Sequence, residues 1–171
     1  MGTPPTNLQG WLWLFPASYA VHVLEEGLAG ERFHRWIRHA TGRTLNPGAF
    51  WAVNGVLWAM MVGAVLAARN HGALDWIVTA LGTLVAVNGA GHIVGTLFTG
   101  TYSPGLFTGG LLWLPLGLSV LWKAWQAGSR VSFATGVVLG LVVQAGVASL
   151  AFALSHRTAG RGGRAWPQLR R

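Results

Sequence analysis

The chain has 171 residues, of which 52% are hydrophobic and only 9% are charged, whereas about a quarter of the residues of a soluble domain are charged. It contains no cysteine, which excludes disulfides, thiolate metal sites, iron–sulfur clusters and cysteine nucleophiles. The formal net charge is +8, but the arginines lie in connectors and at the C-terminus, where topology signals and anionic lipid contacts are found, so we expect no nucleic-acid partner. The composition therefore indicates an integral membrane protein.

Five apolar segments are long enough, at about 20 residues, to cross the hydrocarbon core of a bilayer. In chain order they are residues 8–28, 47–68, 74–98, 105–127 and 131–154. Between the first two, residues 31–46 mix arginines with Phe33, Trp36 and Ile37, which predicts a short amphipathic helix in the headgroup region. The sequence therefore predicts an all-α membrane protein. We expect a bundle of five transmembrane helices with one short interfacial helix between the first and second, and a single domain over residues 1–155.

The basic residues predict the orientation of this bundle. The side that holds residues 31–46 and the C-terminal tail carries nine of the twelve basic residues, and the other side carries Arg69, Lys123 and Arg130. An excess of basic residues marks the cytoplasmic side. We therefore expect a multi-pass protein of the plasma membrane with its N-terminus outside and its C-terminus in the cytoplasm. Residues 156–171 are rich in glycine and arginine, which predicts a disordered cytoplasmic tail that contacts anionic lipids.

The first three spans carry polar side chains, which are costly in a bilayer unless they face the bundle interior. They are His22, Glu25 and Glu26 in the first span, Asn54 in the second, and Asn88 and His92 in the third. At about 100° per residue, the first three share one helical face. At about 1.5 Å per residue, His22, Asn54 and His92 each lie about 10 Å from the cytoplasmic end of their span. We expect one polar pocket in the inner leaflet, closed from the cytoplasm by the hydroxyl of Tyr102 in the next connector.

Three short motifs carry a resemblance to a known family. The stretches "HVLEE" (His22 to Glu26), "NGAGH" (Asn88 to His92) and "YSPG" (Tyr102 to Gly105) resemble, in order, the three motifs of the HXXEE family. That family comprises small integral membrane proteins of bacteria and archaea with no assigned activity. The resemblance covers the chain from about Tyr19 to Thr108. It implies that the motif residues are the functional ones, and it supplies no reaction.

The residue types in this pocket favour a metal site. Two imidazoles and a carboxylate make a three-ligand set for Zn²⁺ or Fe²⁺ that leaves a coordination position open. We expect the ligands among His22, Glu25, Glu26 and His92, with the second glutamate acting as general base or as partner of a ligand, and Tyr102 as a further catalytic group. Asn54 and Asn88 would orient ligands or a substrate oxygen. The function predicted first is a membrane metalloenzyme, a hydrolase or an oxidoreductase, acting on a lipid or another lipophilic small molecule.

Two other functions fit the same residues. Without a metal, a glutamate in a medium of low dielectric constant beside a histidine can deliver or remove protons, which suits an isomerase, cyclase or hydratase of a lipid. Alternatively, the polar groups form a hydrogen-bonded clamp between helices in a non-catalytic scaffold or sensor. A carboxylate-bridged di-iron site is excluded because it needs four carboxylates and two histidines, and the chain has four acidic residues in all, one of them far away at Asp75.

Overall fold

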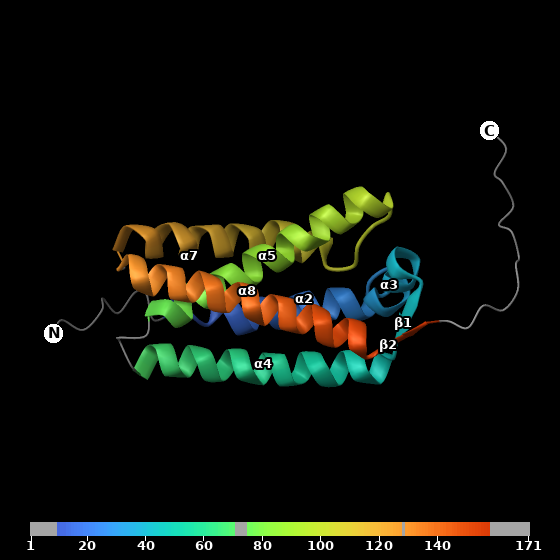
Figure 1. Ribbon diagram of the computed structural model, residues 1–171, viewed down its shortest axis with the longest axis horizontal. Helices are drawn as coiled ribbons and strands as arrows, with labels where there is room; N and C mark the ends of the chain where they lie inside the picture. Colours follow the sequence, from blue (N-terminus) through green and yellow to red (C-terminus); the bar gives the residue numbers. More distant parts are fainter. Residues whose placement is uncertain (1–9, 71–74, 128, 158–171) are drawn as a thin grey trace, which may run out of the picture.

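The structure of the protein is a computed structural model in which residues 10–70, 75–127 and 129–157 are described. The expected starts of the first and third spans, at residues 8 and 74, lie outside the described residues, as does the predicted tail from residue 158 onward. Figure 1 shows long helices lying side by side, with a short helix and a two-stranded sheet gathered at one end.

Four of the helices are long and apolar enough to span a membrane. They are α4 (Pro47–Asn70), α5 (Asp75–Thr99), the continuous helical stretch Leu106–Gln126 and α8 (Arg130–Ala153). The third of these stretches comprises α6 (Leu106–Thr108), the π-helical turn η1 (Gly109–Trp113) and most of α7 (Leu114–Ala127). Their ends agree with the second to fifth predicted spans to within two residues.

The first predicted span differs from these four. Its described part is residues 10–28, in which α2 (Leu14–Leu28) is a helix of 15 residues. At 1.5 Å per residue α2 is about 22 Å long, shorter than a hydrocarbon core of about 30 Å. Pro16 lies in its first turn and Gly30 follows its C-terminus with a positive φ. The described residues therefore contain four helices that could span a membrane, not the five expected.

A short helix, α3 (Phe33–Thr41), lies between the first two predicted spans, within the segment expected to hold an amphipathic helix. Its buried Trp36 packs against Gly95 of α5. A two-stranded antiparallel sheet follows, formed by β1 (Arg43–Leu45) and β2 (Ser155–Arg157). Residues 156 and 157, which the sequence predicts as the start of the tail, pair with β1, and strands of three residues are too short to show an alternating pattern. The sheet joins the end of α8 to the start of α4.

Helix α5 is the centre of the bundle and has more buried residues than any other helix described. Helix α8 packs on it through Gly136 and Gly140, where an added Cβ would meet Thr79 and Thr83. Such contacts between small residues let helix backbones approach closely. Helix α4 packs more loosely and buries only Phe50, Met61 and Val65. In Figure 1, α4 and α7 lie at opposite edges of the bundle, which leaves room for a cavity between α4 and the α5–α8 pair.

Candidate metal centre

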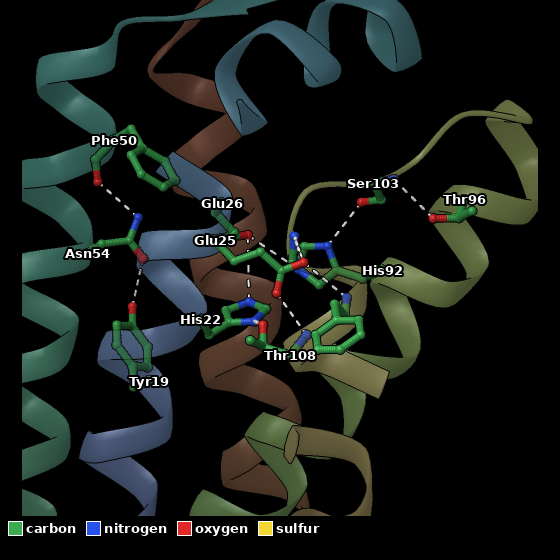
Figure 2. A network of polar contacts seen from close by, with 12 residues as sticks. Tyr19, His22, Glu25, Glu26, Phe50, Asn54, His92, Thr96, Ser103 and Thr108 are labelled. Atoms are coloured by element: carbon green, nitrogen blue, oxygen red, sulfur yellow. Dashed lines mark hydrogen bonds and ion pairs between the residues drawn. The ribbon is translucent and has the colours of Figure 1, made fainter. Parts of the chain in front are cut away.

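Two histidines and one glutamate from separate helices converge in the interior. His22 and Glu26 lie one turn apart on α2, and His92 lies near the end of α5. Oε1 of Glu26 is 3.7 Å from Nε2 of His22 and 3.3 Å from Nε2 of His92. The three residues are only 1%, 7% and 6% exposed. Figure 2 shows both imidazole rings turned toward Glu26, so the predicted shared pocket is present for these three residues.

Each imidazole is held by a hydroxyl on its other nitrogen. Nδ1 of His22 lies 2.7 Å from Oγ1 of Thr108, and Nδ1 of His92 lies 3.0 Å from Oγ of Ser103. When Nδ1–H is donated to a hydroxyl oxygen, the lone pair of Nε2 is the one that faces Glu26. The ring of Trp113, brought into place by the turn η1, stacks on His22 with the centroids 3.8 Å apart. A π-helical turn within an α-helix is frequent at functional sites.

This donor set fits a small divalent cation. Ligands bound at 2.0–2.1 Å to a tetrahedral Zn²⁺ lie about 3.3 Å from one another, close to the two Nε2–Oε1 distances, and all three donor atoms lie within 4.8 Å of one another. Nε2 of His22 is buried and has no hydrogen-bond partner among the described residues. Three electron-rich atoms that face each other in a buried site require a cation or a proton between them. The group formed by His22, Glu26 and His92 is called the His/Glu cluster below.

Glu25 lies outside the His/Glu cluster, although it is the neighbour of Glu26. Its carboxylate accepts hydrogen bonds from the hydroxyl of Tyr102 and from three backbone N–H groups, those of Gly105 at 3.2 Å, Phe107 at 3.0 Å and Thr108 at 2.7 Å. These N–H groups belong to the start of α6, where unpaired amides and the helix dipole favour an anion. Glu25 therefore fixes the segment 102–108 to α2, and the structure gives it partners other than those of a metal ligand.

The segment 102–108 covers the cluster and supplies its hydroxyls. Gly105 has φ of +97°, and a Cβ added there would lie 2.7 Å from Cε1 of His92 and 2.8 Å from Cε1 of His22, so this position requires glycine for two reasons. Ser103 and Pro104 are fully buried beside it. The ring of Tyr102 is exposed, whereas its hydroxyl faces Glu25. Partial burial, and next the hydrogen bond to Glu25, raise the pKa of Tyr102 to about 12.

A cavity of about 460 Å³ extends from the cluster into the bundle. His22 and Glu26 line one part of it, and apolar side chains of α4, α5 and α8 line most of the rest, among them Phe50, Leu57, Met60, Met61, Leu81, Leu84, Val143 and Val147. A cavity of this size and polarity, with a few convergent polar groups, is typical of a site for a small lipophilic molecule.

The two predicted asparagines both line this cavity. Asn54 bridges two helices, because its Oδ1 accepts a hydrogen bond of 2.8 Å from the hydroxyl of Tyr19 and its Nδ2 donates to the carbonyl of Phe50 at 2.9 Å. Asn88 lies beside His22, and its Oδ1 has no partner with hydrogen-bonding geometry among the described residues. Gln144 of α8 also lines the cavity. Gln144 was not predicted as a site residue, because it stands alone in an apolar span.

Comparison with known proteins identifies the family. A family model described as a protein of unknown function with HXXEE motif matches residues 13–120. The chain belongs to the HXXEE family. No curated protein and no solved structure matches the chain. The resemblance inferred from the three motifs is therefore confirmed. The residues of the HXXEE motif have different places in the structure. His22 and Glu26 belong to the His/Glu cluster, while Glu25 holds the third motif, residues 102–105, in place.

Three residues around the cluster were not predicted. Ser103 lies within "YSPG", so its motif was a signal that could have found it. Thr108 and Trp113 follow that motif in an apolar stretch, and nothing in their spacing distinguishes them from ordinary span residues. Trp113 lies in the turn η1, which adds a residue to one helical turn and which the sequence pattern does not show.

Proposed function

We propose that the protein is an integral membrane enzyme in which His22, Glu26 and His92 hold one divalent metal ion, Zn²⁺ or Fe²⁺. The observation that carries the proposal is the convergence of two Nε2 atoms on one oxygen of Glu26, with both Nδ1 atoms held by hydroxyls. Hydrogen-bonded outer partners of this kind orient metal-binding histidines. Three protein ligands leave a position for water or substrate, and a bound divalent ion there would supply a Lewis acid.

The cavity supports a lipophilic substrate. Its walls are mostly apolar, and His22 and Glu26 line the part at the cluster. A substrate whose polar end reaches His22 and Glu26 would place its apolar part against α4 and α8. In this proposal Glu25 and Tyr102 hold the segment 102–108 over the cluster, and Asn54 and Asn88 belong to the wall that receives the substrate.

Metal-free acid–base chemistry is the second candidate, and one distance favours it. Oε1 of Glu26 lies 3.3 Å from Nε2 of His92, which is near the range for direct proton transfer. A proton shared between these groups would suit an isomerase, cyclase or hydratase of a lipid. The third candidate function for the same contacts is a clamp between α2 and α5 without catalysis.

The position in the membrane is part of the proposal. We propose that α2, together with residues before it, forms a fifth span, that α3 lies at the cytoplasmic surface, and that the N-terminus is outside the plasma membrane. The four long apolar helices and the excess of arginine on one side support this, and the arginines after residue 157 would contact anionic lipids. Labelling a single cysteine placed after residue 157 in intact cells tests the orientation, because labelling from outside would contradict it.

Metal content separates the three candidate functions. We expect about one equivalent of zinc or iron in the purified protein, and its loss in His22→Ala and His92→Ala, because each variant removes one of three ligands. His39→Ala is the matched control, since His39 is an exposed histidine of α3 paired with Glu31, and it should keep the metal. A folded wild type without metal would contradict the proposal and favour acid–base chemistry. Unfolding of both variants in a metal-free protein would favour the clamp.

A further inference from the structure

Three carboxamides line the cavity outside the proposed metal centre, and because Asn54 is bonded to Tyr19 and Phe50, Asn88 and Gln144 are the remaining two. Asn88 comes from α5 and Gln144 from α8, and both line the cavity together with His22 and Glu26. No lysine, arginine or aspartate is found among the described residues that line it. Glu26 is therefore the acidic residue of this wall, and the cavity offers an anionic ligand no cationic side chain.

The packing of α8 on α5 places the two carboxamides at a similar level along the bundle. Gly136 lies against Thr79 and the carbonyl of Trp76, and Gly140 lies against Thr83 and the carbonyl of Ala80. Each step of four residues along α8 thus matches a step of four along α5. One further step brings residue 144 to the level of residues 84–87, directly before Asn88, and both amide side chains line the cavity.

Each carboxamide has a hydrogen-bonding group without a partner within the described part of the chain. Oδ1 of Asn88 is buried without a hydrogen bond, although the side chain lies beside His22, and no side-chain hydrogen bond of the half-buried Gln144 is found among the described residues. An unpaired carboxamide in an apolar interior costs roughly 1–3 kcal/mol, and polar groups inside membrane spans mark sites for ligands. A hydroxyl group, which can both donate and accept, satisfies two neighbouring amides.

We propose that Asn88 and Gln144 bind the hydroxyl group of an uncharged lipophile, so that the substrate class is a long-chain or polycyclic alcohol and not a fatty acid or a phospholipid. This inference rests on the proposed function for the place of the cluster beside the bound hydroxyl. The wall at the two amides supports it, because a carboxylate or phosphate held there would have no cationic side chain to offset its charge in apolar surroundings. The volume of about 460 Å³ suits one chain or ring system.

Competition binding tests this substrate class. Tritiated tetradecan-1-ol is bound to the purified full-length protein on scintillation beads, and unlabelled tetradecan-1-ol, tetradecanoate or tetradecane is added as competitor. We expect the alcohol to compete at least about tenfold better than either of the others, as one or two hydrogen bonds allow. Absence of saturable alcohol binding, or equal or stronger competition by tetradecanoate, would overturn the proposal.

Variants test whether the two amides cause the preference for the alcohol. Asn88→Leu and Gln144→Met keep the side-chain size and should each weaken alcohol binding about fivefold to tenfold. Val142→Met is the control, because Val142 lies on the exposed face of α8, and it should leave binding unchanged. If one variant fails to fold, the other variant and the ligand preference of the wild type still test the proposal. Unchanged binding in folded variants would overturn the proposal.

The same assay after removal of metal by a chelator distinguishes this proposal from that of the metal centre. A preference for the alcohol that persists without metal, or in a protein that never contained metal, supports recognition by the amides whatever the fate of the metal proposal. A preference that disappears with the metal would assign recognition to the ion and overturn the role of Asn88 and Gln144.

Discussion

The two sides of α2 differ sharply although their key residues are neighbours. On one side, Glu26 is buried and faces two imidazoles, and no backbone N–H of the described residues donates to it. On the other side, Glu25 is half-buried and accepts three backbone N–H groups and a tyrosine hydroxyl. Glu26 thus requires a cation or proton, whereas Glu25 is already satisfied as an anion at a helix N-terminus. Adjacent identical residues therefore have different partners and different environments in this protein.

The Glu25 side also supports the Glu26 side. The segment that Glu25 holds contributes Ser103 and Thr108 to the two imidazoles and places Gly105 against both rings. Because both hydroxyls and the covering glycine lie between residues 102 and 108, loosening this segment changes the orientation of both histidines at once. The comparison predicts that changes at Glu26 act on the metal directly, and that changes at Glu25 act through the segment 102–108.

The largest expected effect is that of Glu26→Gln on metal content. We expect metal affinity to fall by at least about 100-fold, because loss of a ligand exceeds the 10–100-fold typical of an outer partner. Glu25→Gln is the matched variant and should keep the metal, with affinity lowered by about tenfold. Metal analysis after dialysis against a weak chelator measures both. Loss of metal in Glu25→Gln but not in Glu26→Gln would reverse the assignment of the two sides.

Gly105→Ala should destabilise the protein by about 2–3 kcal/mol. The new Cβ would lie within 3 Å of both imidazoles, and φ of +97° adds backbone strain of about 1 kcal/mol or more. Gly100→Ala is the control, because Gly100 also has a positive φ, of +63°, but open space around it, so it should cost only about 1 kcal/mol. Equilibrium unfolding in mixed micelles measures both, and equal costs would show that the segment does not press on the rings.

Much of this arrangement was predictable from sequence. The second to fifth spans follow from runs of apolar residues, because the bilayer leaves a chain few alternatives. The meeting of His22 and His92 follows from their equal depth and from the cost of polar groups in lipid. The different environments of Glu25 and Glu26 were not predictable, because both lie within 60° of His22 on the helix and only the path of residues 102–108 separates them.

Other features depend on tertiary packing alone. The sheet of β1 and β2 joins residues more than 100 positions apart in strands of three residues, which leave no periodic signal. Gln144 gains its significance from the step-for-step packing of α8 on α5, a relation between two spans that neither span shows by itself. The end of the first predicted span at residue 28 agrees with the end of α2 at Leu28, whereas its start lies outside the described residues.

Glu25→Gln should loosen the segment 102–108 by about 1–2 kcal/mol. An amide offers one acceptor oxygen and would direct its NH₂ group at backbone donors, so at least one of the three N–H bonds is lost. Hydrogen exchange of the amides of Gly105, Phe107 and Thr108 measures the change and should accelerate about fivefold to thirtyfold, while amides in the middle of α5 keep their rates. Uniform acceleration over the whole bundle would instead indicate global destabilisation.

The smallest expected effect is the pH dependence of the contact between Tyr102 and Glu25. The pKa of Tyr102 is raised to about 12, above the value of about 10 for an unperturbed tyrosine. A raised pKa means that the folded state favours the neutral phenol, so the contribution of this contact is complete below pH 10 and is lost as the pH rises toward 12. The chain has two tyrosines, so absorbance of the phenolate in a Tyr19→Phe variant reports Tyr102 alone. We expect a midpoint near 12 that falls toward 10 when Glu25→Gln is added, and a midpoint near 10 in both proteins would show that Glu25 does not hold this hydroxyl.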